Sequence, residues 1–167
     1  MQRGEYFPFD VLGLWQALHA KRAAMGLSER EMMDDLNRVN HNSMPIALAT
    51  VNGMKKRMDT SCQHSLHMLR WLDKTPESFL QGAGIDERLP FSADAPLYWS
   101  MKAVGEAVAA EKVKRNLSWK QVAQELEASQ NQVSAIHKLR YGMSVHLAMK
   151  ITQWLNRPSS DFIVVFK

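Results

Sequence analysis

The sequence predicts an all-α fold built from two tandem helical domains. The first observation behind this prediction is an internal repeat. The segment GLSEREMMDDL at residues 26–36 is matched by NLSWKQVAQEL at residues 116–126. The later segment LRWLDKTPESFL at residues 69–80 is matched in the same way by TQWLNRPSSDFI at residues 152–163. Self-similarity of this kind indicates two copies of one supersecondary unit. The second observation is that apolar residues recur at helical spacing in both copies.

A stretch with glycines and prolines at its ends divides the two copies. Residues 82–96, GAGIDERLPFSADAP, have this composition and are expected to form a linker. We therefore expect one domain at residues 1–81 and a second domain, with a short C-terminal tail, at residues 97–167. The 167 residues are 46% hydrophobic and 23% charged, close to globular averages, which argues against extended disorder.

The sequence also indicates a compartment. It contains no run of about 18 apolar residues, and its N-terminal residues lack the apolar core of a signal peptide. We therefore expect a cytoplasmic protein without membrane contact. The single cysteine, Cys62, cannot form an internal disulfide, which agrees with a reducing environment.

Five helices are expected in each copy, and the first two start the unit. The first helix has an apolar stripe and ends in basic residues, where the helix dipole favours cations. The second helix begins with a capping box in both copies. Ser28 precedes Glu31 by three residues, and Ser118 precedes Gln121 by three residues. This shared start fixes the register of the repeat.

The third helix differs between the copies. In the second copy only two residues separate the second helix from Ser129, a natural N-cap, and Val133 and Ile136 are expected to face inward. In the first copy the connection lengthens to residues 38–44, and Pro45 is expected in the first turn of a helix that runs to about Lys55.

The fourth and fifth helices close each unit. The fourth is expected at about residues 61–72 and 145–155, each copy ending in a Trp-Leu pair. A final short turn of helix is expected to bring Phe79 and Phe162 to the core. The apolar tail, residues 163–167, is expected to form a short strand or to dock on the body. Apolar residues in the linker suggest that it lies against a domain.

The formal charge of +4 and the pI of about 9.3 are mildly basic, and the basic residues gather in the second copy. From residue 97 onward ten basic residues stand against five acidic ones, whereas through residue 81 the numbers are ten and nine. If the chain binds a polyanion, the C-terminal half is the better candidate.

Residues 117–139 resemble, without a gap, the helix-turn-helix of lambda-repressor-like (Xre family) DNA-binding domains. The features that carry this resemblance are the polar cap, the small Ala123 where two helices touch, the short turn and the polar third helix near basic residues. The similarity covers nearly the whole chain, and the LRWL…TPESFL ending looks like tandem Xre-type regulators of bacteria and phages. It implies two five-helix lambda-repressor-like domains.

The resemblance also implies which residues contact double-stranded DNA, because the third helix of such domains lies in the major groove. In the second copy the implied base-reading residues are Gln130, Asn131, Gln132 and Ala135. Glutamine and asparagine amides can pair bidentately with adenine, and an alanine can touch a thymine methyl group. The implied phosphate contacts of this copy are Ser118, Trp119, Lys120, Lys138 and Arg140.

The first copy departs from the pattern, since Met33 replaces the small residue and the turn is longer. Its implied base-reading residues are Ala49, Thr50 and Asn52. Its implied phosphate contacts are Lys55, Lys56 and Arg57. The apolar residues Ala47, Leu48 and Val51 leave open a second use of this helix, in which it meets a protein partner rather than DNA.

We therefore expect a sequence-specific transcriptional regulator, most simply a repressor, associated with the nucleoid as a monomer or homodimer. The competing class is an antitoxin or an adaptor in a phage or defence system, with DNA binding secondary. The simplest structural alternative for residues 117–140 is a plain helical hairpin. No phosphate-cradling loop or nucleophile elbow is present, so no enzyme activity and no cofactor are expected. Cys62, His64 and His67 lack a second metal-ligating group nearby, so no metal is expected either.

Overall fold

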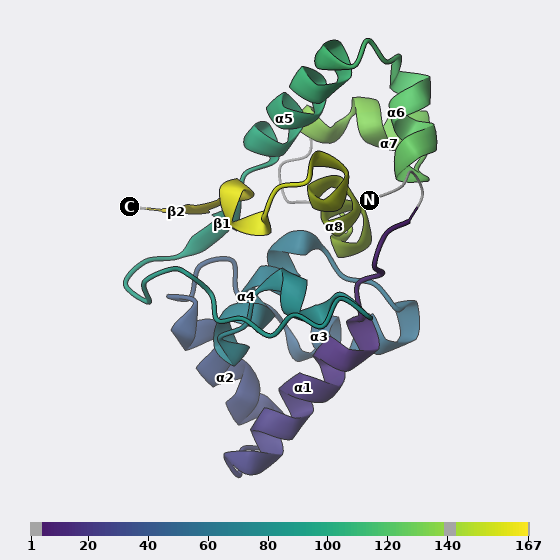
Figure 1. Ribbon diagram of the computed structural model, residues 1–167. Coiled ribbons are helices and arrows are strands. Elements are labelled where there is room, and N and C mark those ends of the chain that lie inside the picture. Colours follow the sequence, from purple (N-terminus) through teal and green to yellow (C-terminus); the bar gives the residue numbers. More distant parts are fainter. Residues whose placement is uncertain (1–4, 139–142, 167) are drawn as a thin grey trace.

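The computed structural model describes residues 5–138 and 143–166, and these residues form eight α-helices and one two-stranded antiparallel sheet. The fold is therefore mostly helical, as the sequence predicts. Figure 1 shows α1 to α4 in the lower part of the molecule and α5 to α8 in the upper part, with the linker crossing in front of the lower part and turning up at the left.

The N-terminal half consists of four α-helices and a 3-10 helix. Their bounds are α1 (Val11–Ala24), α2 (Glu29–Val39), α3 (Leu48–Arg57), α4 (Cys62–Leu72) and η1 (Pro76–Phe79). The capping box of Ser28 and Glu31 is present at the start of α2, which confirms the predicted register. The core lies where α1 packs against α3 and α4, around the fully buried Leu14 and Leu18.

The C-terminal half repeats this order of elements. Their bounds are β1 (Leu97–Trp99), α5 (Met101–Lys114), α6 (Trp119–Leu126), α7 (Gln130–Ser134), η2 (Ile136–Lys138), α8 (Val145–Leu155), η3 (Ser159–Phe162) and β2 (Ile163–Val165). The capping box of Ser118 and Gln121 and the predicted bounds of α8 are confirmed. The tail forms a strand, and Phe162 is buried as expected.

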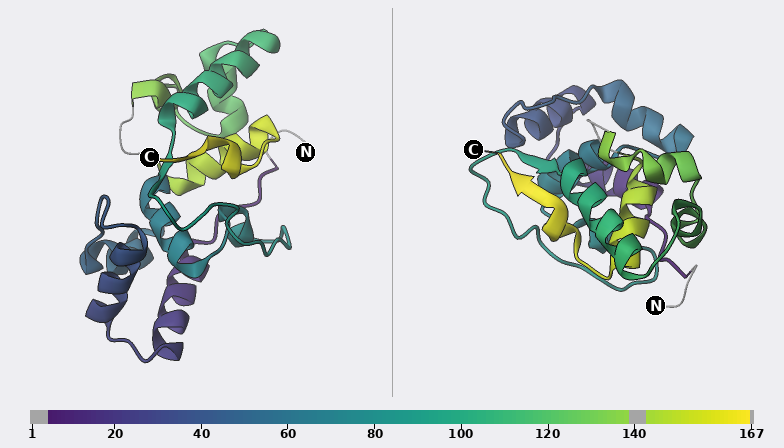
Figure 2. Two further views of the ribbon diagram at one scale, coloured as in Figure 1. Left: turned by 90° about the vertical axis from the view of Figure 1, so that its left-hand side faces the viewer. Right: turned by 90° about the horizontal axis from the view of Figure 1, so that it is seen from above.

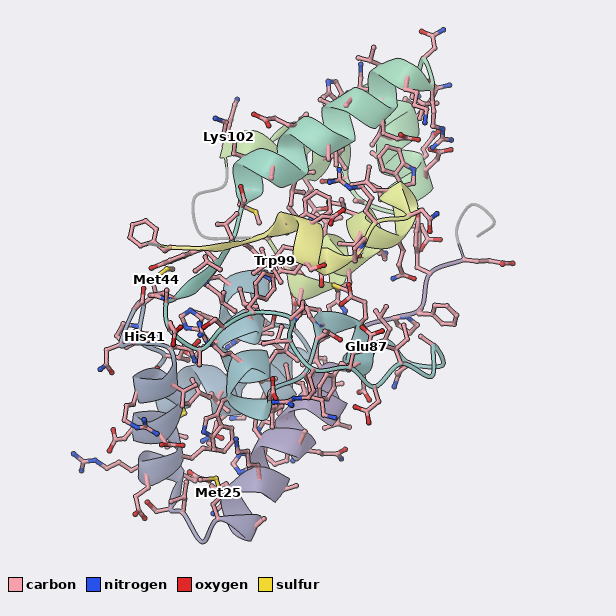
Figure 3. The ribbon with its side chains drawn as sticks, turned by 60° about the vertical axis from the view of Figure 1, so that its left-hand side comes forward. Met25, His41, Met44, Glu87, Trp99 and Lys102 are labelled. Atoms are coloured by element: carbon pink, nitrogen blue, oxygen red, sulfur yellow. The ribbon has the colours of Figure 1, made fainter. Side chains whose placement is uncertain are left out.

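One predicted boundary is wrong. The third helix of the N-terminal half begins at Leu48, so Pro45 lies in the preceding loop rather than in its first turn. This loop is hydrogen-bonded to the linker and to β1. The ring nitrogen Nε2 of His41 hydrogen-bonds the carbonyl oxygen of Ala93 at 2.8 Å, and the hydroxyls of Ser43 and Tyr98 are hydrogen-bonded. Figure 3 shows His41 on this loop beside the linker. These tertiary contacts hold the loop in place, and α3 begins after it, at Leu48.

The contact between the strand and the tail recurs in both halves. Trp99 pairs with Ile163 in the β1–β2 sheet, and Phe9 pairs with Leu80 as an isolated antiparallel bridge. The next bond is also repeated. The amide of Asp10 donates to the carbonyl of Phe79 at 2.7 Å, and the amide of Ser100 donates to that of Phe162 at 2.8 Å. The sheet is therefore a longer form of a bridge that exists in the first copy too.

A tryptophan on the fourth helix of each half donates its indole N–H to a carboxylate on the second helix. Trp71 Nε1 donates to Asp35 Oδ2 at 2.8 Å, and Trp154 Nε1 donates to Glu125 Oε2 at 3.0 Å. Asp35 and Glu125 stand at the same position of the repeat. The Arg115 guanidinium also donates to Glu125 Oε1, at 2.7 Å. The two halves therefore share a polar contact as well as a chain path.

The two halves meet along the starts of α4 and α8. Ser61 pairs with Ser144 as an antiparallel bridge. The side chain of Glu77 accepts hydrogen bonds from the amide and the hydroxyl of Ser159, at 2.6 and 2.8 Å. Figure 3 shows Trp99, a buried residue of β1, between the upper and lower parts of the molecule. The halves are thus joined by direct contacts in addition to the covalent linker.

The linker lies on the body of the protein, as the sequence suggests. Leu89 and Phe91 are half-buried against the core. The Arg70 guanidinium donates to the carbonyl oxygens of Ala95 and Ser92, the latter at 2.8 Å. Within the described part of the chain, none of the helices has both the length and the apolar character needed to cross a membrane.

Stability is expected to depend on pH through His67, which is only 1% exposed on α4. Burial, with smaller contributions from the nearby His64 and Arg70, lowers the pKa of His67 to about 4, from 6.5. Between these pH values the unfolded chain binds a proton that the folded chain does not. The contribution of neutral His67 to the free energy of unfolding is therefore fully present above pH 6.5. It is lost as pH falls toward 4, by up to about 3 kcal/mol.

Urea unfolding of the wild type and of H67Q at several pH values tests this prediction. The wild type should lose stability across this window, and H67Q should lose clearly less. Some dependence should remain in the variant, because burial also lowers the pKa of His19 and His64. Equal slopes in the two proteins would contradict the assignment to His67.

Candidate nucleic-acid interface

The helices α6 and α7 are joined by a turn of three residues, 127–129. Glu127 adopts the left-handed backbone conformation, with φ of 53°, and closes the end of α6. Ser129 then caps α7, since its hydroxyl accepts from the amide of Gln132 at 3.1 Å. The buried side chains Val133 and Ile136 attach the segment to the core, as predicted. The outward start of α7 is therefore held by two caps and an apolar anchor.

The predicted base-reading residues of this half differ in availability. Gln130 and Asn131 are exposed on the first turn of α7. Gln132 is also exposed, but its Oε1 accepts the amide of Ser129 at 3.0 Å, which leaves the amide NH₂ group as its outward-facing donor. Ala135 is half-buried and ends α7. Gln130 and Asn131 are therefore adjacent exposed side-chain amides, whereas the Gln132 side chain takes part in the cap.

The predicted phosphate contacts of this half lie around the start of α6 and the end of η2. Ser118 is exposed, and its hydroxyl accepts from the amide of Gln121 at 3.1 Å. Trp119 is half-buried, with the Lys112 ammonium 5.2 Å from its ring centre. Lys120 and Lys138 are exposed. Arg140, the fifth of these residues, lies outside the described residues.

In the N-terminal half, α3 presents a mixed outer face. Ala49 and Asn52 are exposed, and Thr50 is half-buried. Val51 and Met54 are fully buried, and α3 packs against α1. The apolar surface considered for a protein partner was Ala47, Leu48 and Val51. Since Val51 belongs to the core, this prediction is wrong for that residue, whereas Ala47 is exposed and Leu48 is half-buried.

The three basic residues at the end of α3 are exposed, but their side chains are not equally free. The Lys55 ammonium lies 4.5 Å from the centre of the Trp15 ring, a cation–π contact. The Arg57 side chain folds back over Gly53, where an added Cβ would lie 2.5 Å from Nη1. Lys56, between them, is exposed. All three lie where the helix dipole favours positive charge.

Sequence reasoning missed two of these contacts. The Gln132 cap has a signal in the sequence, because Ser129 and Gln132 are spaced like Ser118 and Gln121. The contact of Trp15 with Lys55 joins residues far apart in sequence and has no local signal.

The third helices of the two halves lie on the same side of the molecule. In the right-hand view of Figure 2, seen from above, α3 and α7 both lie in the upper part of the picture. In the left-hand view the α7–η2 segment and α3 lie toward the left, away from the linker.

Cys62 and His67 are both buried in α4. Burial raises the pKa of the Cys62 thiol to about 12, so it is a poor metal ligand near neutral pH. His67 is buried, and its Nε2 is 3.0 Å from Gln63 Nε2. Among the residues that the structure describes, no group of three His, Cys, Asp or Glu side chains is placed to hold a metal ion.

Comparison with known proteins adds no relative: no protein-family model, no curated protein and no solved structure matches this chain.

Proposed function

We propose that this chain is a sequence-specific double-stranded DNA-binding transcriptional regulator of the lambda-repressor-like, Xre type. In this proposal residues 1–81 and 97–167 are tandem five-helix domains joined by residues 82–96, and the third helix of each enters the major groove. Repression is the simplest mode, because a chain bound at a promoter excludes polymerase without any further contact.

The observation that carries the proposal is the exposed pair Gln130 and Asn131 at the capped start of α7. Neither residue contributes its side chain to the core, and neither is the cap. Carboxamides present a donor and an acceptor side by side, which matches the N6 and N7 edge of adenine in the major groove. The three-residue turn after α6 leaves the first turn of α7 exposed, as contact with bases requires.

The basic residues support the same use. Lys120 precedes the amide pair in the sequence and Lys138 follows it, and both are exposed, as is Lys56 at the end of α3. Contacts of this kind hold the phosphate backbone and set the position of the protein without reading sequence.

The test is a selection of purified chain against random duplexes. Repeated selection should enrich one motif with adenines at defined positions. A pool that stays random after several rounds, with the protein folded by circular dichroism, would overturn the proposal.

The phosphate contacts predict a salt dependence. Each lysine that neutralises a phosphate adds about 0.9 to the slope of log affinity against log salt for B-DNA. K56A and K138A should each reduce the slope by about 1 and weaken binding to all sequences alike. The control is K74A, because Lys74 pairs with Asp86 of the linker. Fluorescence anisotropy between about 50 and 200 mM salt measures the slopes. If K74A changed the slope as much as K56A, the assignment of Lys56 would be wrong.

A further inference from the structure

The contact between the two halves pairs equivalent residues with each other. Ser61 and Ser144 are the N-caps of the fourth helices, and they form an antiparallel bridge. The amide of Cys62 donates to the carbonyl of Met143 at 2.8 Å, and the amide of Val145 donates to that of Thr60 at 2.9 Å. Self-pairing of equivalent positions is the property of an isologous, two-fold interface.

The segment that leads into each half is also held by the other half, through glutamines that stand at different positions of the repeat. The side chain of Gln153 on α8 accepts from the amide of Phe7 at 2.9 Å and donates to its carbonyl at 3.1 Å. The side chain of Gln63 on α4 accepts from the amide of Trp99 at 2.9 Å and donates to the carbonyl of Leu97 at 3.0 Å. Each half therefore holds the leading segment of the other through a glutamine of its fourth helix.

We infer that the two halves form an internal pseudo-dimer that binds inverted, unlike half-sites as a single chain. This inference rests on the proposed function. Two halves joined head to tail by translation would present α3 and α7 in the same sense and would read a direct repeat. A two-fold relation reverses one of them, and the two strands of duplex DNA are related in the same way, so the matching site is inverted.

The half-sites are unlike because the two third helices differ at matching positions. The two third helices can be aligned by their buried residues, with Val51 matching Val133 and Met54 matching Ile136. In this register Leu48 and Ala49 stand where the other half has Gln130 and Asn131. The α7 half is therefore expected to read adenine, whereas the α3 half offers mainly apolar contact and Asn52.

The arrangement of half-sites within the selected motif tests the inference, and the number of chains per duplex tests it independently. We expect two inverted elements of different strength, centred about one helical turn or a multiple of it apart, and one chain per duplex by native mass spectrometry. A direct repeat, a single uninterrupted element or two chains per duplex would overturn the inference. The proposed function would survive any of these results, because a motif would still have been enriched.

A gain of symmetry provides a second test. L48Q/A49N places the amide pair of α7 on α3, and the selected motif should then become more nearly palindromic, with the stronger element appearing inverted at the weaker position. The matched control is A23Q/A24N, which places the same pair on the exposed end of α1 and should leave the motif unchanged. Appearance of the second strong element in direct orientation would contradict the inference. If L48Q/A49N fails to fold, the wild-type motif still decides.

Discussion

Replacing Gln130 and Asn131 with alanine is expected to weaken binding to the selected duplex by about 30-fold or more, while leaving non-specific binding nearly unchanged. Each good bidentate contact to a base provides about 1–3 kcal/mol of discrimination, and both side chains are exposed at the start of α7. The fold should tolerate the change, because Ser129, Gln132 and Val133 still hold the helix. Anisotropy titrations with the selected and a scrambled duplex measure both affinities.

The control for this double variant is Q81A, since Gln81 is an exposed glutamine that follows η1. Q81A should bind both duplexes as the wild type does. If Q130A/N131A lost affinity for the selected and scrambled duplexes by the same factor, the pair would contact phosphate rather than bases. If the variant bound both duplexes with the affinities of the wild type, Gln130 and Asn131 would not contact the DNA.

Replacing Glu125 with alanine is expected to cost about 3 kcal/mol of folding stability, which corresponds to a fall in Tm of about 6–12 °C for a protein of this size. The Glu125 carboxylate is 8% exposed and accepts from Arg115 and from the Trp154 indole. Its removal leaves two partly buried donors without this acceptor. Thermal unfolding followed by circular dichroism measures the change.

The equivalent position in the other half supplies a matched comparison. Asp35 also accepts from a tryptophan, but its side chain is 24% exposed and its other partner, Arg38, is 70% exposed. The salt bridge to Arg38 is therefore expected to add little, and D35A should cost about 1 kcal/mol. A loss in D35A as large as that in E125A would show that burial does not set the energy of this contact.

The sequence predicts the parts of the fold that local chemistry determines. Capping boxes satisfy amides at the ends of helices, so Ser28 and Ser118 fix the starts of α2 and α6 without help from the rest of the chain. The repeat carries the same register into the fourth helices, and the predicted bounds of α8 are confirmed.

The remaining features depend on contacts between residues that are distant in sequence. The start of α3 is set by a loop that binds residue 93 of the linker and Tyr98 of β1. Burial of His67 and Val51 depends on how α4 and α3 pack, which helical spacing alone does not decide. The pairing of Ser61 with Ser144 joins the two copies. A repeat in the sequence predicts two units but does not predict how they are oriented.

Sequence-specific binding can be measured as the ratio of two affinities of the wild-type chain, one for its selected duplex and one for a scrambled duplex of the same composition, at about 150 mM salt. Specific DNA-binding proteins prefer their sites by about a thousandfold or more. We expect a ratio of at least that order for this chain, with the preference depending on Gln130 and Asn131. Equal affinity for the two duplexes would contradict sequence-specific recognition by this chain.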